Sequence, residues 1–344
     1  MTSNPMPPER LLELDDVQVH FPLREGLVKA VNGVSYHVNK GEVLGIVGES
    51  GSGKSITARA IMRLLPKRAV AAGGSIRLRP RTGEEFELSA LDRNSRAIRQ
   101  VRGQHIGMVF QEPMTALSPV HTIGTQIMRT VQLHKGLNRA DARARAIDLL
   151  AKVQMPRPSE MVDAYPHQLS GGMRQRAMIA LAISCDPSLL IADEPTTALD
   201  VTTEAQILEL LKQLQSEMGM AIIFITHNFG VIADIADRVS VMYLGRIVET
   251  ATVDDIFYAP KHPYTKALLR SIPRLGVDQG RRLPTIPGMV PDPFSVPPGC
   301  AFNPRCTYAR PGICDVTTPP AKHFGNQISR CHFAEKLAEE HAHV

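Results

Sequence analysis

Three short apolar runs stand out in the pattern of hydrophobic and polar positions along the chain. They are VLGIV at Val43–Val47, LLIA at 189–192 and AIIFI at Ala221–Ile225. Runs of this length without alternation are typical of strands buried on both faces of a parallel sheet. The first is followed by a glycine-rich turn and then by ITARAIMRLL, a stretch compatible with a helix. The pattern predicts an α/β fold.

The sequence contains no apolar run of the length that crosses a membrane. None approaches the roughly 18 residues of a spanning helix, and the start, MTSNPMPPER, has no apolar segment of the kind found in secretory signals. With 344 residues, of which 43% are hydrophobic and 21% charged, the composition is ordinary for a globular protein with one large domain and something smaller. We expect a chain that does not span a membrane by itself.

The positive charge is modest and dispersed. The net charge is +5, but Lys and Arg are scattered and form no dense basic block. This balance mildly favours an anionic ligand or a membrane surface as a partner. It argues against nucleic acid, for which a basic patch or a recognisable motif is expected.

A phosphate-binding motif follows the first apolar run. GESGSGKS at 48–55 fits G-x-x-x-x-G-K-[ST] at every fixed position, between a predicted strand and a predicted helix. A turn that binds nothing is the alternative, and this context disfavours it. Glycines let backbone N–H groups surround phosphate oxygens, and the helix N-terminus adds partial positive charge. The residues expected to hold the triphosphate are Gly48, Ser50, Gly51, Ser52, Gly53, Lys54, Ser55 and Thr57.

Two acids end the second apolar run, in LLIADEP. Asp193 is placed at the end of a strand to hold Mg²⁺ together with Ser55. Glu194 is placed to polarise a water for in-line attack on the γ-phosphate. Two solvated carboxylates at a strand end would explain this pair alone, but the phosphate loop favours the catalytic interpretation.

Further motifs give the chain a family resemblance. LSGG at 169–172, ahead of a helix and of the acidic strand, resembles the signature of ATP-binding-cassette (ABC) ATPases. Gln111 in VFQEPMTALSP resembles the Q-loop glutamine, and Ala198-Leu199-Asp200 resembles the D-loop. His227 in FITHN resembles the switch histidine, and Phe21 is a candidate for the aromatic that stacks on adenine. Met173 stands where most signatures have Gln, as is common in the peptide-importer branch.

The resemblance implies a fold and a set of roles. The expected fold is a P-loop NTPase cassette at 10–258 with a RecA-like core, an antiparallel β subdomain and a helical subdomain at about 112–170. Glu194, His227 and Gln111 would be catalytic, with Gln111 also near Mg²⁺. Ser170, Gly171, Gly172 and Asp200 would contact ATP held by a partner cassette, because one chain cannot fold its signature onto its own phosphate loop.

The intervals between motifs favour a transporter subunit. They leave no room for the long insertions of cassette ATPases that act on DNA or in translation. GESGSGKS, YPHQLSGGMRQRAMIA, HPYTKALLRSIPRL and the tail resemble ATPase subunits of dipeptide, oligopeptide and nickel importers, with the D-type subunit of dipeptide importers the closer match. The resemblance implies peptide import, with nickel or another small solute as the alternative. A cassette ATPase acting on nucleic acid is a remote alternative.

The importer resemblance also implies partners and a location. A second, similar ATPase would pair with this chain as a heterodimer. Two permease subunits would supply the membrane spans, and an extracytoplasmic solute-binding protein would deliver the substrate. The complex would place this chain peripherally on the cytoplasmic face of the inner membrane.

Four of the five cysteines lie in a proline-rich extension at 259–344. They are Cys300, Cys306, Cys314 and Cys331, in the pattern C-x₅-C-x₇-C-x₁₆-C. Disulfides are disfavoured in the cytosol. Zinc remains open, although structural zinc sites usually contain a C-x₂₋₄-C pair. Four thiolates also satisfy a [4Fe–4S] cubane, and relatives with this tail resemble proteins that hold one, so we expect a cluster. Arg305, beside Cys306, is expected to be solvated, and Cys185 an ordinary buried thiol.

Overall fold

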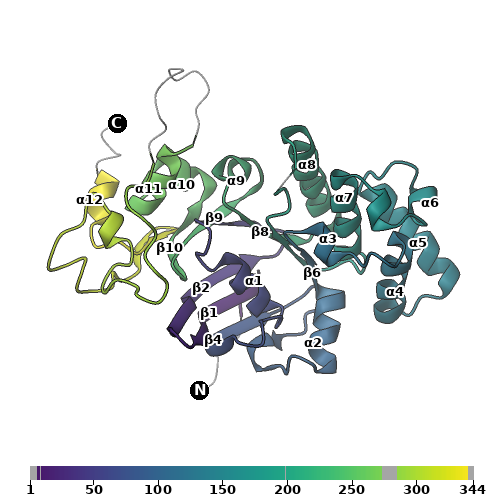
Figure 1. Cartoon of the computed structure of the whole chain (residues 1–344), viewed down its shortest axis with the longest axis horizontal. Helices are drawn as coiled ribbons and strands as arrows, with labels where there is room; N and C mark the ends of the chain where they lie inside the picture. The colour runs from purple at the N-terminus through teal and green to yellow at the C-terminus, as the bar shows by residue number, and fades with distance from the viewer. Residues whose placement is uncertain (1–5, 8, 198, 273–284, 340–344) are drawn as a thin grey trace.

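The apolar runs form the centre of an eight-stranded sheet in the computed structural model, which describes residues 6–7, 9–197, 199–272 and 285–339 (Figure 1). In spatial order the strands are β11 (Lys322–Phe324), β12 (Gln327–Ser329), β10 (Arg246–Thr252), β9 (Arg238–Tyr243), β3 (Val43–Val47), β8 (Ala221–Thr226), β7 (Leu189–Asp193) and β6 (Ile106–Val109). Five neighbouring strands, from β9 to β6, are parallel to one another. The three strands beyond β9, at the other edge, each run antiparallel to their neighbour.

The central strands are buried on both faces, as their apolar runs predict. Along β3, Val43 and Val47 pack into the core on one face, and Leu44 and Ile46 into the core on the other. Every residue of β3, β7 and β8 is buried. The absence of alternation in these runs therefore reflects two cores, one on each side of the sheet.

A smaller antiparallel sheet covers one of these cores. Its order is β2 (Gly26–Asn39), β1 (Arg10–Leu23), β4 (Val70–Leu78) and β5 (Phe86–Glu87). The helix α1 (Lys54–Ile61) packs beside it, and α2 (Arg96–Gln100) follows before β6 (Figure 1). Short turns of 3₁₀ helix at Leu88–Ala90 and of π helix at Val101–His105 complete this part of the chain.

A group of helices stands at the opposite end of the molecule from the chain's C-terminal region (Figure 1). It contains α3 (Pro113–Ala116), α4 (Ile123–Lys135), α5 (Arg139–Lys152), α6 (Pro158–Met161), a 3₁₀ turn at Pro166–Gln168 and α7 (Gly171–Ala182). The core sheet is flanked further by α8 (Val201–Met218), α9 (Phe229–Ile235), α10 (Val253–Tyr258) and α11 (Pro263–Arg270).

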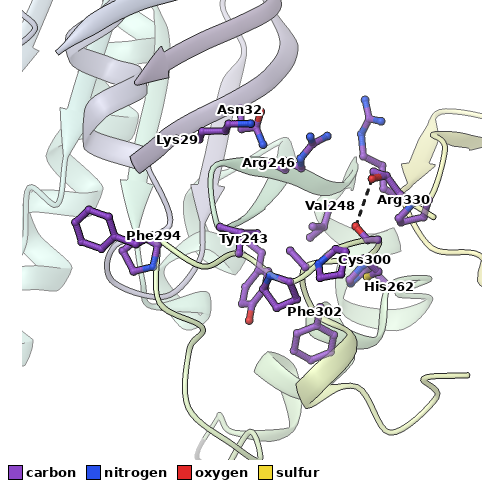
Figure 2. A pocket seen from close by; sticks show the side chains of 18 of the residues that line it. Lys29, Asn32, Tyr243, Arg246, Val248, His262, Phe294, Cys300, Phe302 and Arg330 are labelled. Carbon is purple, nitrogen blue, oxygen red and sulfur yellow. Dashed lines mark hydrogen bonds between the residues drawn. The ribbon is translucent and has the colours of Figure 1, made fainter. Parts of the chain in front are cut away.

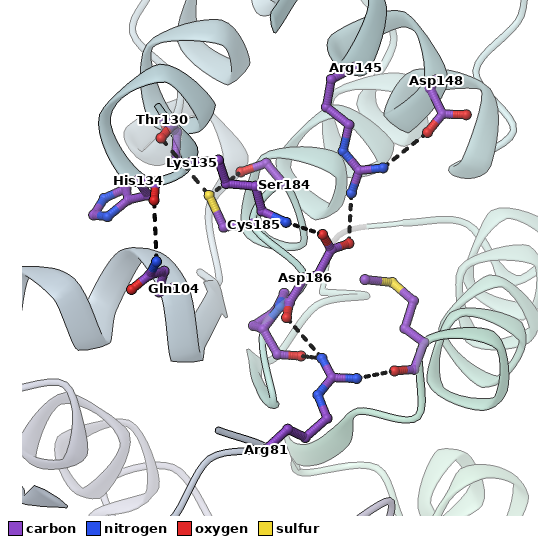
Figure 3. Close-up of polar contacts among 12 residues, drawn as sticks. Arg81, Gln104, Thr130, His134, Lys135, Arg145, Asp148, Ser184, Cys185 and Asp186 are labelled. Carbon is purple, nitrogen blue, oxygen red and sulfur yellow. Dashed lines mark hydrogen bonds and ion pairs between the residues drawn. The ribbon is translucent and has the colours of Figure 1, made fainter. Parts of the chain in front are cut away.

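The carboxylate of Asp186 joins the helical group to the core, in the loop between α7 and β7. It accepts from Lys135 on α4 and, at 2.6 Å, from Arg145 on α5 (Figure 3). On the core side, Arg81 donates to the backbone carbonyls of Asp186 and Pro187, at 2.8 Å each. Burial acts to raise the pKa of Asp186, but the two cations outweigh it and hold that pKa below its usual range.

The C-terminal region contributes two strands to the eight-stranded sheet. In β12, Ile328 and Ser329 pair with Thr250 and Glu249 of β10, and β11 pairs with β12. Around these strands the extension is irregular, as its proline content predicts, with a 3₁₀ turn at Asn303–Arg305 and a final helix α12 (Ala334–Glu339). Within the described residues, no helix combines the length and apolar character needed to cross a membrane.

Candidate active site

The phosphate loop connects β3 to α1, and two of its glycines leave no room for a side chain. Gly48 has φ +156°, and a Cβ there would lie 2.1 Å from the carbonyl oxygen of Met242. Gly53 has φ +105°, and its Cβ would lie 2.3 Å from the carbonyl oxygen of Ala30. The loop is therefore wedged between β2 and the end of β9, which fixes its curvature.

Polar groups of the loop face inward without a full set of partners. Lys54 Nζ donates to the carbonyl oxygens of Gly48 at 2.7 Å and Glu49 at 3.0 Å. Burial lowers the Lys54 pKa, against the pull of nearby carboxylates. Ser52 is 3% exposed, and its hydroxyl has no hydrogen-bond partner among the described residues. A phosphate oxygen would satisfy this orphaned hydroxyl and the ammonium, so the loop fits a triphosphate.

Other loop residues occupy simpler positions. Ser50 and Gly51 lie exposed at the tip of the loop. Thr57 is buried, and its hydroxyl donates to the Gly53 carbonyl at 3.0 Å, which anchors the first turn of α1 to the loop.

The side chains of Ser55 and Asp193 lie close enough to bind one cation together. The Ser55 hydroxyl donates to Asp193 Oδ1 at 2.8 Å, from the first turn of α1 to the end of β7. Burial raises the Asp193 pKa, and the charge of Glu194 adds to this, while the Ser55 hydrogen bond opposes it. Oxygen ligands of this kind suit Mg²⁺, whose charge would stabilise the buried carboxylate.

Glu194 is the centre of a polar cluster at the carboxyl ends of the strands. Gln111 Nε2 donates to one carboxylate oxygen at 3.2 Å, Thr197 Oγ1 donates to the same oxygen at 2.9 Å, and His227 Nδ1 lies 3.3 Å from the other. Glu194 has φ +47°, which a non-glycine residue rarely adopts. Such strain is tolerated where the surroundings hold the residue, and it is frequent at functional sites.

The structure thus brings together the three residues predicted as catalytic. Thr197 was missed, because a threonine in a turn carries no motif of its own. Its position three residues after Glu194 is the signal that could have identified it.

Two residues of the signature, Ser170 and Gly171, are exposed at the N-terminus of α7, whereas Leu169 is buried. Ser170 caps this helix by accepting from the Met173 N–H at 3.3 Å. A Cβ on Gly172 would lie 2.8 Å from Thr203 Cγ2, so this helix start packs closely on α8. Asp200 caps α8, and its hydrogen bonds with the backbone and hydroxyl of Thr203 lower its pKa. Ser170 and Gly171 remain free to meet a ligand from outside the chain.

The remaining predicted positions are Phe21 and the first residue of the D-loop. Phe21 lies on β1 opposite Val28, half-buried against the core beneath the small sheet. Ala198, the first residue of the predicted D-loop, lies outside the described residues.

The four cysteines of the extension line one small cavity, with aromatic and histidine side chains around it. Burial raises the pKa of Cys306 to about 11 and of Cys331 to about 12, and the neighbouring thiols reinforce both shifts. In the described part of the chain, no three His, Cys, Asp or Glu side chains form a group that could hold a metal ion. The cluster expected from the sequence is therefore not supported by this geometry.

Two single-residue expectations have different outcomes. Cys185 is buried, with its sulfur 3.9 Å from the Thr130 carbonyl, as expected of an ordinary core thiol (Figure 3). The expectation that Arg305 is solvated is wrong. Its side chain is 4% exposed and pairs with Glu49 of the phosphate loop. The pairing spans 256 residues of sequence, which no local pattern reveals.

Known proteins resemble this chain over most of its length. The family described as "ABC transporter" matches residues 31–197, and "Oligopeptide/dipeptide transporter, C-terminal region" matches 248–314. A peptide import ATP-binding protein of Brucella melitensis biotype 1 is 51% identical over 330 residues, covering 93% of this chain and 97% of the relative. A peptide ABC transporter ATP-binding protein of Sinorhizobium fredii is 50% identical over 320 residues, covering 93% of each.

Solved structures show the same cassette. The dimeric MJ0796 cassette in a post-hydrolysis state, bound to ADP and phosphate, is 26% identical with a TM-score of 0.62, covering 71% of this chain and 99% of that one. The cbiO1 protein of Clostridium perfringens, part of an ABC transporter complex, is 26% identical with a TM-score of 0.60, covering 73% and 92%. The chain therefore belongs to the ABC transporter family, as an ATP-binding subunit that hydrolyses ATP.

Proposed function

We propose that this chain energises the import of di- or oligopeptides through a multi-subunit ABC transporter. The proposal rests on one observation: the chain combines an ATPase site with a C-terminal region of the oligopeptide/dipeptide transporter type. Relatives that align over most of the chain are named for peptide import or as parts of a peptide ABC transporter, which supports the same substrate class.

In the proposed hydrolytic step, the loop amides and Lys54 hold the β- and γ-phosphates. Ser55 and Asp193 would hold Mg²⁺, which supplies charge neutralisation on the phosphate oxygens when bound. Glu194 polarises the attacking water and accepts its proton. Gln111 and His227 contact the two oxygens of Glu194, so both can orient that carboxylate.

The exposed signature supports pairing with a second cassette. Ser170 and Gly171 are exposed at the start of α7, where backbone N–H groups and the helix dipole favour an anion. A head-to-tail partner would bring its bound ATP to this point and receive this chain's ATP at its own signature. We infer a heterodimer with a similar ATPase, with Asp200 at the contact.

The remaining partners complete an importer. Two permeases would supply the membrane path and contact the helical subdomain near 112–170. A solute-binding protein would deliver substrate from outside. This chain would then sit peripherally on the cytoplasmic side of the inner membrane, with a cassette at 10–258 and the extension at 259–344.

We further propose that Cys300, Cys306, Cys314 and Cys331 bind a [4Fe–4S] cluster, for which the four thiols must move closer together than they are in the described structure. All four thiols border one cavity, and no carboxylate is among the described residues that line it. A thiolate-only set is the usual ligation of such a cluster, and zinc is the alternative occupant. Iron, acid-labile sulfide and zinc are measured in anaerobically purified protein. About four irons and four sulfides per chain are expected, one zinc without sulfide would support zinc instead, and no metal would refute both.

Uptake by living cells tests the substrate. A strain lacking this chain is supplied with labelled dipeptide or with Ni²⁺, and is complemented by the wild-type chain or by the Lys54→Ala variant. Peptide import predicts loss of dipeptide uptake that only the wild-type chain restores. Loss of Ni²⁺ uptake with normal dipeptide uptake would favour the nickel alternative.

A further inference from the structure

Glu49, the second residue of the phosphate loop, is held at all three of its polar groups. Its carbonyl oxygen accepts from Lys54 Nζ at 3.0 Å. Its backbone N–H donates to Tyr264 Oη at 3.0 Å, and its carboxylate accepts from Arg305 Nη1 and Nη2 at 2.7 and 3.0 Å. Tyr264 lies on α11 and Arg305 in the 3₁₀ turn at Asn303–Arg305. Two of the three anchors therefore come from the region after the cassette.

Arg305 itself has little freedom to move. Nε donates to the Pro287 carbonyl at 3.2 Å, and Nη1 donates to Tyr243 Oη at 3.4 Å. The guanidinium carbon lies 5.9 Å from the ring centre of Tyr243 and 6.0 Å from that of Phe302. The Glu49 bonds, with their bidentate geometry, raise the Arg305 pKa, so this guanidinium is always charged.

The rings around Arg305 form a rigid support between the cassette and the extension. The ring centres of Tyr243 and Tyr264 are 4.6 Å apart, and those of Tyr243 and Phe302 are 5.4 Å apart. Figure 2 shows Tyr243 and Phe302 at one wall of a cavity of about 340 Å³, whose opposite wall includes Lys29 and Asn32 of β2. Phe302 also borders the cavity of the four thiols.

We propose that Tyr264 and Arg305 are positioning residues for ATP, acting through Glu49; these three residues are called the Glu49 clamp. The clamp fixes the peptide groups that accept from Lys54 and so sets the shape of the phosphate loop. Arg305 also neutralises the carboxylate of Glu49. The charge of that carboxylate acts on Lys54 and, without Arg305, would repel a triphosphate bound by Lys54.

The inference rests on the assignment of the phosphate loop proposed above, and it makes a kinetic prediction. Arg305→Gln leaves Glu49 charged without its partner, so the Kd and KM for ATP rise by about 10- to 30-fold, which is less than the full cost of breaking a buried charge pair because only part of that cost falls on ATP binding. Tyr264→Phe removes one neutral hydrogen bond and raises both by about 3- to 10-fold. The kcat stays within about threefold, because neither residue contacts Glu194.

A second substitution distinguishes positioning by charge from general structural damage. Adding Glu49→Gln to Arg305→Gln removes the repelling carboxylate, while Tyr264 and Lys54 still hold the backbone of residue 49, so the double variant regains most of the ATP affinity. A purely structural role for Arg305 predicts no recovery. The matched control is Arg143→Gln, because Arg143 makes a similar bidentate pair with Asp163, at 2.8 and 2.6 Å, on the exposed surface of the helical group. It should leave the Kd for ATP unchanged.

The experiment measures Kd with a fluorescent ATP analogue, and kcat and KM in the assembled complex, with metal content and circular dichroism recorded for each variant. Wild-type Kd in Arg305→Gln, or no recovery in the double variant, overturns the clamp. If Arg305→Gln fails to fold, Arg305→Lys and Tyr264→Phe decide, and wild-type Kd in both overturns it. The Lys54→Ala variant is measured in parallel. If it still binds ATP, the assignment of the phosphate loop is wrong. If it loses ATP binding while the Arg305 variants bind ATP with the wild-type Kd, only the clamp is wrong.

Discussion

Replacing Glu194 by Gln removes the proposed general base with little change in shape. The amide oxygen can still accept from Thr197 and Gln111, whose donors lie 2.9 and 3.2 Å from the present carboxylate oxygen. The backbone at φ +47° is held by the same surroundings. The phosphate loop is untouched, so ATP binding should persist while proton acceptance from water is lost.

The expected loss is about 10²- to 10⁴-fold in kcat, the usual contribution of general acid–base catalysis. The assay is steady-state ATP hydrolysis by the assembled transporter, with the Kd for ATP measured on the same preparation. Glu209→Gln, at an exposed position of α8, is the matched control and should hydrolyse ATP normally. Near-normal turnover in Glu194→Gln would refute the assignment of the base, whereas lost ATP binding would show that Glu194 also builds the binding site.

Three further substitutions test the electrostatics of the site and its supports. Burial raises the Asp193 pKa in the folded protein, so the free energy of unfolding falls as pH rises above the ordinary pKa of Asp. Asp193→Asn should therefore raise the free energy of unfolding of the nucleotide-free protein at pH 7 and abolish the added stability from Mg-ATP, both measured by urea unfolding. Asp186→Asn keeps a residue that tolerates φ +55° but loses the ion pairs to Lys135 and Arg145. It should cost about 0.5–1 kcal/mol at pH 7, with a smaller loss in high salt and at pH values below the depressed pKa; an equal loss at all salt concentrations would contradict an ionic origin. Ser52→Ala should leave the unfolding free energy within about 0.5 kcal/mol, because its hydroxyl has no partner in the described structure, yet weaken ATP binding by about 3- to 10-fold; unchanged affinity would show that the hydroxyl does not meet a phosphate.

The sequence predicted the centre of the site because its chemistry is local. The phosphate loop, the acids after β7 and the histidine after β8 each follow a short apolar strand, and parallel strands deliver their carboxyl ends to one edge of the sheet. The helix start at Ser170 is likewise readable from a serine followed by glycines. Residues that belong to a local motif could therefore be named from the sequence, whereas Thr197, which lies close to Glu194 but has no motif, was missed.

The extension was less predictable because its contacts are long-range. Nothing near Lys322–Phe324 or Gln327–Ser329 indicates that these strands continue the cassette's sheet through β10. Arg305 looked like a surface arginine, since burial of a guanidinium depends on an acid far away in the chain. The four thiols were expected to gather, and they do line one cavity, but their spacing alone left the occupant open.

The most direct test of the central claim is ATP-driven uptake of a labelled dipeptide. Proteoliposomes would contain the permeases, this chain and its partner cassette, with the solute-binding protein added on the side of its substrate. The account predicts accumulation only with ATP on the side of the cassettes, and none when this chain carries Lys54→Ala. Accumulation that needs no ATP, or that survives Lys54→Ala in this chain, would contradict its role as the energising subunit.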